Sequence, residues 1–227
     1  MATQTAPAGH ASATFINRGR IGLLSGALAA TSVLGVIGIV LWPAASGDFF
    51  GYGDVAPIRE RFFWTITAMA LTFALNVPLQ GLAGMVIVRR RASGWATAGA
   101  ALLWLGAAAQ ATAMGGWAML YYFATGPSLP ENAARPFLDA LVNDGRLFAV
   151  ALASQSLVIL GTILQAAGMF ASRAVPWWVP ALTLTLVPTV VLPANGPAGL
   201  IGAVPVAAGS IAMAWYAWRR TVGATAG

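Results

Sequence analysis

The chain contains no cysteine and no lysine, and its only histidine is His10. Without cysteine there is no disulfide framework, no thiolate metal site and no cysteine nucleophile. A single histidine near the N-terminus argues against a haem and against a histidine-ligated catalytic metal. We therefore expect neither a cofactor nor a metal site.

Charged residues are also scarce, since Asp, Glu, Lys and Arg make up 8% of the 227 residues while 59% are hydrophobic. A soluble domain carries about a quarter charged residues, so this chain cannot cover itself with a water-facing surface. Apolar runs long enough to cross about 30 Å of hydrocarbon recur along it, which indicates an integral membrane protein. The arginines lie in short clusters between these runs, which is a topology signal and does not indicate nucleic-acid binding.

The apolar runs predict an all-α fold, a polytopic membrane bundle of six transmembrane helices. In chain order, the expected spans are about 21–42, 62–88, 95–123, 147–171, 177–194 and 198–218. They would form one transmembrane domain over residues 18–220. Residues 1–17 are small and polar without periodicity, and they predict a disordered cytoplasmic tail. Residues 221–227 predict a short second cytoplasmic tail.

The arginines predict the orientation of the bundle. In the six-span arrangement, one side carries eight arginines and no acidic residue, namely Arg18, Arg20, Arg89, Arg90, Arg91, Arg173, Arg219 and Arg220. The opposite side carries the other four arginines and all six acidic residues. Basic residues beside spans stay in the cytoplasm, so both termini are expected inside. A different span count would destroy this alternation, which supports six spans.

Arginine as the sole basic residue, together with abundant alanine, is typical of GC-rich bacterial genomes. With short arginine loops such as Ser172-Arg173-Ala174-Val175-Pro176, the chain resembles the uncharacterised six-span membrane proteins of such bacteria. The resemblance implies a multi-pass protein in the bacterial inner membrane, in contact with the lipid bilayer. It implies no activity.

The stretch Gly51-Tyr52-Gly53-Asp54 resembles the selectivity filter of potassium channels, in which backbone carbonyls replace an ion's hydration shell. A filter also needs a pore helix before it, because irregular backbone at membrane depth must be buried in protein. Only the six residues 43–48 separate the first predicted span from Phe49, which is too few for that helix. We therefore interpret the stretch as a tight outer turn whose glycines supply positive φ.

No Asp, Glu, Arg or His lies in the central part of any predicted span. A proton-driven pump is therefore disfavoured, because proton relays depend on such groups. Amides and hydroxyls remain inside the spans. The candidate ligand-binding residues are Asn76, Gln80, Gln110, Gln165 and Thr185, which would surround a cavity within the membrane. The alternative is that these residues only form packing seams between helices.

Proline gives a second indication of a binding site. The chain divides into two halves of three spans with opposite orientations, and the middle span of each contains proline. Pro78 would interrupt the helix in the first half, and Pro188 and Pro193 would do so in the second. Helices interrupted at matching places in inverted halves are typical of a transporter's binding site.

Two non-enzymatic functions are consistent with these observations. The first is binding or transport of a small or lipidic ligand in the amide-lined cavity. The second is an accessory subunit that packs against another membrane protein through small-residue seams. Such seams occur at Gly26 and Ala30 on the first span and at Gly161, Gln165 and Gly168 on the fourth.

A third hypothesis is an outer-face enzyme that acts on a lipidic substrate through the acidic residues Asp54, Glu60 and Asp144. The alternative is that Glu60 and Asp144 favour helix N-termini and pair with neighbouring arginines. No nucleophile, phosphate-binding or metal-binding motif accompanies the three acids. The sequence therefore favours a protein that is not an enzyme, and it assigns no catalytic residue.

Overall fold

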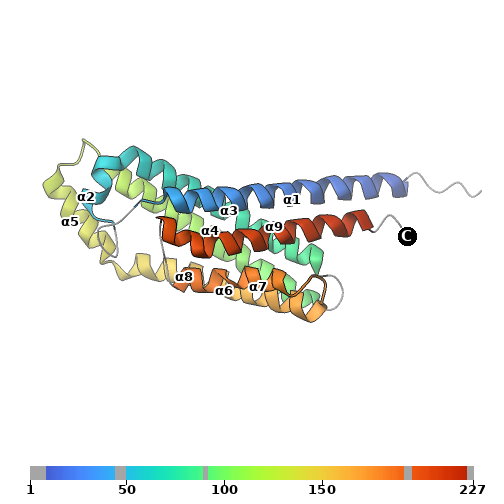
Figure 1. Ribbon diagram of the computed structural model, residues 1–227. Coiled ribbons are helices and arrows are strands. Elements are labelled where there is room, and N and C mark those ends of the chain that lie inside the picture. Colours follow the sequence, from blue (N-terminus) through green and yellow to red (C-terminus); the bar gives the residue numbers. More distant parts are fainter. Residues whose placement is uncertain (1–8, 44–49, 89–91, 192–195, 224–227) are drawn as a thin grey trace, which may run out of the picture.

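The computed structural model describes residues 9–43, 50–88, 92–191 and 196–223, and these residues are helical apart from short turns (Figure 1). The long helices are α1 (Gly9–Leu41), α3 (Arg59–Ile87), α4 (Ser93–Ala124), α6 (Gly145–Ser172) and α9 (Leu200–Gly223). The short elements are α2 (Tyr52–Val55), η1 (Ala56–Ile58), α5 (Glu131–Val142), α7 (Trp178–Leu184), α8 (Leu186–Val191) and η2 (Gly196–Gly199). The predicted all-α fold is confirmed.

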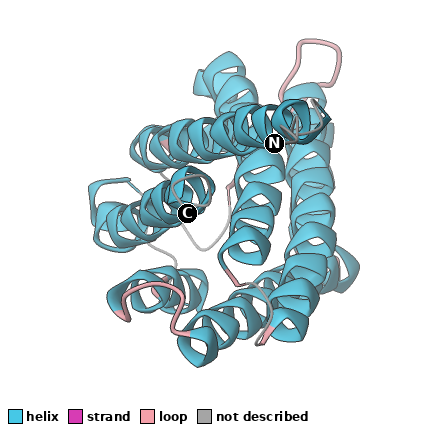
Figure 2. Ribbon diagram, turned by 90° about the vertical axis from the view of Figure 1, so that its right-hand side faces the viewer, coloured by secondary structure: helices cyan, strands magenta, loops and turns pink. Residues whose placement is uncertain are grey.

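Within the part of the chain that the structure describes, four helical segments are long and apolar enough to cross a membrane, namely Arg18–Leu41, Tyr52–Ile87, Ala149–Ser172 and Leu200–Arg220. They run roughly along one axis together with α4, as Figures 1 and 2 show from two sides. The segment Trp178–Thr189, which includes α7, is apolar but shorter. The chain therefore has the form of a helical membrane protein.

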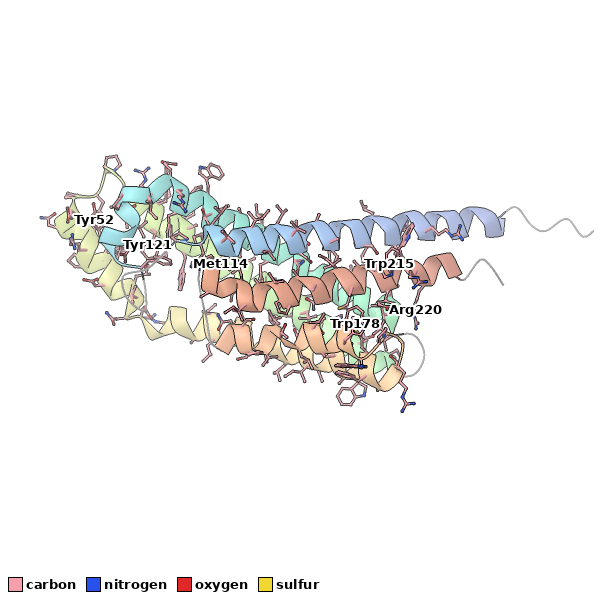
Figure 3. The ribbon with its side chains drawn as sticks, viewed as in Figure 1. Tyr52, Met114, Tyr121, Trp178, Trp215 and Arg220 are labelled. Atoms are coloured by element: carbon pink, nitrogen blue, oxygen red, sulfur yellow. The ribbon has the colours of Figure 1, made fainter. Side chains whose placement is uncertain are left out.

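The two ends of the bundle differ in charge. One end, which we call the arginine end, carries Arg18, Arg20, Arg173, Arg219 and Arg220. The opposite end, which we call the acidic end, carries Asp54, Glu60, Glu131, Asp139 and Asp144. The start of α1 and the end of α9 both lie at the arginine end, on the right in Figure 1. Aromatic residues occur at both ends, with Trp178 and Trp215 at the arginine end and Tyr52 and Tyr121 at the acidic end (Figure 3).

Helices α4 and α6 pack with their backbones in close approach. A Cβ atom added at Gly99 would lie 2.8 Å from the carbonyl oxygen of Gly161, and one added at Gly161 would lie 2.9 Å from that of Gly99. Neither position has room for a side chain. Small residues allow membrane helices to approach in this way. The small-residue stripe predicted on the fourth span therefore faces α4 inside the protein.

Two expected boundaries differ from the structure. Residues 9–17, predicted to be disordered, form the first turns of α1, while residues 1–8 lie outside the described ranges. Once the apolar part of α1 has nucleated a helix, each further residue adds a hydrogen bond at little cost, and Ala11 and Ala13 favour this extension. At the other terminus α9 continues to Gly223, and residues 224–227 lie outside the described ranges.

The predicted proline breaks occur in only one half of the chain. Helix α3 continues through Pro78 without interruption, so the expected break there is wrong. The indole N–H of Trp104 on α4 donates to the Pro78 carbonyl oxygen at 3.2 Å, a contact that joins α3 to α4 beside the proline. The fifth apolar run is broken, at Thr185 between α7 and α8. Pro188 lies in the first turn of α8, where a missing N–H costs nothing, and Pro193 lies outside the described ranges.

The filter-like stretch starts a helix. Gly51 has an ordinary extended conformation (φ −88°, ψ 171°) and precedes α2, which contains Gly53, so the expected positive φ at these glycines is wrong. The Asp54 carboxylate accepts a hydrogen bond from the Gly51 N–H at 2.8 Å. The Gly51 carbonyl oxygen accepts from the N–H groups of Asp54 and Val55. This carbonyl is thus used within the first turn of α2.

The tight contact between α4 and α6 predicts that substitution of the glycines at this contact lowers stability more than substitution of other glycines of α4. We expect Gly99→Ala and Gly161→Ala each to lower the free energy of unfolding by about 1–3 kcal/mol, because the added methyl group forces the backbones apart. Thermal unfolding of the protein in detergent would measure this.

Gly115→Ala and Gly116→Ala on α4 are matched controls, because a Cβ atom there meets nothing within 4 Å. These variants should keep or slightly raise the unfolding temperature, since alanine is the better helix former. Equal effects at all four positions would contradict the close packing of α4 and α6.

Candidate functional site

A cavity of about 690 Å³ lies between α1, α3, α4, α6, α8 and α9. This volume falls within the range of about 300–1,000 Å³ that is typical of small-molecule sites. Its polar lining residues are Thr31, Ser32, Thr72, Asn76, Gln80, Gln110, Gln155, Thr185, Thr189 and Ser210. None of the described residues that line it is charged, and most of this wall is apolar.

The sequence positions the α3 wall of the cavity through helical periodicity. Met69, Thr72, Asn76 and Gln80 follow one another at steps of three and four residues, which places them on one helix face. All four line the cavity. This polar face, read from the sequence, is therefore turned inward and not toward lipid.

The cavity lies in the half of the bundle nearer the acidic end. On the arginine side, apolar side chains from α1, α3, α6 and α9 form a packed cluster that includes Leu28, Ile87, Met169 and Met213, all of them nearly or fully buried. Toward the acidic end the lining continues to Trp42 and Met114. Met114 is labelled in Figure 3. The cavity is therefore a pocket that is closed on one side, and not a pore.

Asn76 connects α3 to α1 at the cavity wall. Its side-chain Nδ2 donates to the hydroxyl oxygens of Thr31 and Ser32, at 3.0 Å in both cases. These hydroxyls in turn donate to α1 carbonyl oxygens one turn earlier, those of Ala27 and Leu28. The Asn76 Oδ1 has no hydrogen-bond partner among the described residues, so it is an available acceptor in the cavity.

Two further candidates also line the cavity. The side-chain oxygen of Gln110 on α4 accepts a hydrogen bond from the Ser154 hydroxyl of α6. Thr185, at the break between α7 and α8, donates to the Leu182 carbonyl oxygen at 2.6 Å. With Asn76 and Gln80, the structure thus places four of the five predicted ligand-binding residues at one cavity.

Gln165, the fifth candidate, is not among the cavity-lining residues. It is 1% exposed, and its Nε2 donates to the carbonyl oxygens of Gln80 at 3.0 Å and Gly81 at 3.1 Å. A Cβ atom at Gly84 would collide with this side chain. Gln165 therefore joins α6 to α3 and belongs to a packing seam between these helices.

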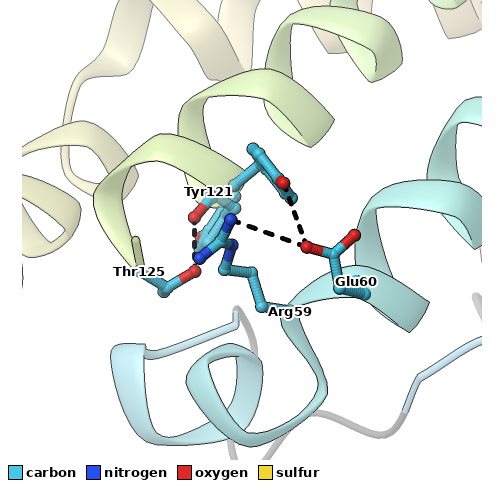
Figure 4. A network of polar contacts seen from close by, with 5 residues as sticks. Arg59, Glu60, Tyr121 and Thr125 are labelled. Atoms are coloured by element: carbon cyan, nitrogen blue, oxygen red, sulfur yellow. Dashed lines mark hydrogen bonds and ion pairs between the residues drawn. The ribbon is translucent and has the colours of Figure 1, made fainter. Parts of the chain in front are cut away.

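The acidic residues proposed for an outer-face enzyme have separate local partners. Glu60 pairs with Arg59 at 3.5 Å and accepts a hydrogen bond from the Tyr122 hydroxyl at 3.0 Å (Figure 4). Asp144 caps α6 by accepting from the Arg146 N–H at 2.9 Å, and its carboxylate also pairs with the Arg146 side chain. Asp54 accepts from the N–H of Gly51, as described above.

None of these three acids lines the cavity. Over the residues that the structure describes, no group of three or more His, Cys, Asp or Glu residues is arranged to hold a metal ion. The partners of Glu60 and Asp144 are those expected of acids that favour helix N-termini and pair with neighbouring arginines. The enzyme hypothesis gains no support from this arrangement.

Sequence reasoning missed several lining residues. Thr31 and Ser32 form a polar pair within the apolar run of α1, and this interruption was a usable signal. Ser210 on α9 lies among Ala and Gly residues and had no such signal. Its position is known only from the packing of α9.

Comparisons with protein-family models, with curated proteins and with solved structures gave no match to this chain.

The different roles of the glutamines predict different effects of substitution. We expect Gln165→Met to lower the free energy of unfolding by about 1–2 kcal/mol, because it removes two hydrogen bonds between α6 and α3. Gln155→Met is the matched comparison, since Gln155 lines the cavity and makes no hydrogen bond among the described residues. The unfolding temperature of the Gln155→Met variant should stay close to that of the unchanged protein. A larger loss in Gln155→Met than in Gln165→Met would contradict these roles.

Proposed function

We propose that this chain is an integral membrane protein that binds, and in that way can transport, a small or lipidic ligand in the cavity. The observation that carries the proposal is the lining itself. It brings Asn76, Gln80, Gln110 and Thr185 together from α3, α4 and the α7–α8 break, and no charged residue is among the part of the lining that the structure describes. A few polar groups in a mostly apolar wall are the common form of a small-molecule site.

We further propose that the chain crosses the membrane six times, with both termini in the cytoplasm of a bacterial cell. Helix α4 has 32 residues and no charged residue, and it packs between α3 and α6. With the four long apolar segments and α4, the α7–α8 segment would be the sixth membrane span. The arginine end would then face the cytoplasm, as basic residues beside membrane spans do.

The absence of cysteine makes the orientation testable by labelling. Single Ser93→Cys and Ser128→Cys variants place a thiol at an exposed position at the arginine end and at the acidic end, respectively. We expect a membrane-impermeant thiol reagent to label intact cells that carry Ser128→Cys and to leave those with Ser93→Cys unlabelled until the cells are broken. Labelling of Ser93→Cys in intact cells would overturn the proposed topology.

Of the two small-residue seams on which the accessory-subunit alternative depends, the one on α6 is not available to a partner protein. Gly161 and Gly168 on α6 are used by α4 inside the chain. Gly26 on α1 remains exposed, and a Cβ atom there meets nothing within 4 Å. An exposed face of this kind is also what contact with lipid requires, so it does not favour a partner protein.

Filling the cavity tests the binding function. Gly35 on α1 lines the cavity, and a Cβ atom there would lie 3.9 Å from Thr72, so a larger side chain can enter without a backbone clash. We expect Gly35→Phe to lose any small molecule that co-purifies with the protein from its own membrane. Native mass spectrometry would detect this loss.

Gly26→Phe, on the exposed face of the same helix, is the matched control and should retain the molecule. The double variant Asn76→Leu with Gln110→Leu gives a second test that adds no bulk to α1. Retention of the same molecule in all of these variants would contradict binding in the cavity.

A further inference from the structure

Two buried polar side chains of the cavity wall each have a polar atom without a hydrogen-bond partner among the described residues. They are the amide nitrogen Nε2 of Gln80 and the hydroxyl of Ser210. Both residues are only 1% exposed, and both line the cavity. A buried donor without a partner costs about 1–3 kcal/mol, so two at one cavity are unusual.

Most other buried polar side chains of the helix interiors do have hydrogen-bond partners. Thr31, Ser32 and Thr162 donate to carbonyl oxygens one turn earlier in their own helices. The amides of Asn76 and Gln165 each make two hydrogen bonds to neighbouring helices. Among buried helix side chains without charge, the unpaired atoms at Gln80 and Ser210 share this exception only with the Ser25 hydroxyl among the described residues, and Ser25 does not line the cavity.

The positions of Gln80 and Ser210 make the two ends of the cavity chemically different. Gln80 is the lining residue of α3 nearest the arginine end, and Ser210 holds the same place on α9. From Gln80 the α3 lining extends to Met69, about 16 Å along the helix at 1.5 Å per residue. Beyond Asn76 and Gln110, the far part of the cavity is lined mainly by apolar residues such as Trp42, Met69 and Met114.

These features define the chemistry of a fitting ligand. An amide N–H and a hydroxyl can both donate to one carbonyl oxygen or to neighbouring acceptors. A charged head group is disfavoured, because no opposite charge among the described residues of the lining would offset its desolvation. The apolar remainder suits a hydrocarbon tail.

We propose that the cavity takes an elongated uncharged lipid, and that the side chains of Gln80 and Ser210 turn toward its carbonyl-bearing head at the closed end and donate hydrogen bonds to it. Its aliphatic tail extends past Met69 and Met114 toward the acidic end. This assignment rests on the proposed function and adds to it the ligand class and the ligand's orientation.

Three probes of equal chain length test the head group, namely a long-chain methyl ketone, the corresponding alkane and the corresponding fatty acid at neutral pH. Binding to delipidated full-length protein in detergent would be titrated by native mass spectrometry. We expect the ketone to bind about ten-fold more tightly than the alkane, since one or two hydrogen bonds are worth that much. The fatty acid should bind more weakly than the ketone.

Gln80→Leu and Ser210→Ala should each reduce the ketone's preference over the alkane several-fold, while alkane binding stays unchanged. Neither variant should be less stable without ligand, because each removes an unpaired polar group. Ser25→Ala is the matched control. Its hydroxyl is also unpaired and buried, but Ser25 does not line the cavity, so the preference should not change.

Equal binding of ketone and alkane, tighter binding of the fatty acid, or an unchanged preference in Ser210→Ala would each overturn the head-group assignment. So would a failure of the ketone to bind, because the proposed contacts would then be absent. The binding function is judged separately: if one of these outcomes occurs but Gly35→Phe still abolishes binding of the probes that the unchanged protein binds, the cavity binds lipids and only the head-group assignment fails.

Discussion

A polar group inside this bundle must find its hydrogen-bond partner within the protein, because the surrounding hydrocarbon offers none. Most of the structure follows from that constraint. Buried hydroxyls bond to their own helices, and the amides of Asn76 and Gln165 bond across to α1 and α3. The interior polar groups thus hold the helices in register, and the two unpaired groups in the cavity wall, those of Gln80 and Ser210, mark the place where something else can bind.

Close packing of small residues determines where the cavity lies. Gly99 and Gly161 bring α4 and α6 together, and Gln165 then reaches the α3 backbone at Gln80. These contacts fill the junction of α3, α4 and α6, while the cluster around Leu28 and Met213 fills the arginine half. Between α1, α3 and α9, toward the acidic end, no comparable packing of described residues fills the space. The cavity of about 690 Å³ is found there.

Much of this fold could be predicted from the sequence, because hydrophobic length and arginine placement are properties of the chain itself. The α3 face with Asn76 and Gln80 was also predictable, since helical periodicity alone determines it. The distinction between Gln165 and Gln110 was not predictable. Both are glutamines within apolar helices, and only the tertiary packing of α6 against α3 assigns one to a seam and the other to the cavity.

Local backbone features were less predictable for a related reason. Pro78 lies within a continuous helix, whereas the fifth apolar run breaks at Thr185. The sequences around Pro78 and around Thr185 give no sign that one helix continues and the other breaks. Ser210 resembles any other small residue of α9 until the helices are assembled and its hydroxyl is found without a partner.

The most direct test of the central claim is an experimental structure of the protein purified with lipid from its own membrane. We expect density for an elongated molecule that is not protein, with its head beside Gln80 and Ser210 and its tail toward Met114. A cavity filled by rearranged side chains, or one that holds only water molecules bound to these two residues, would contradict it.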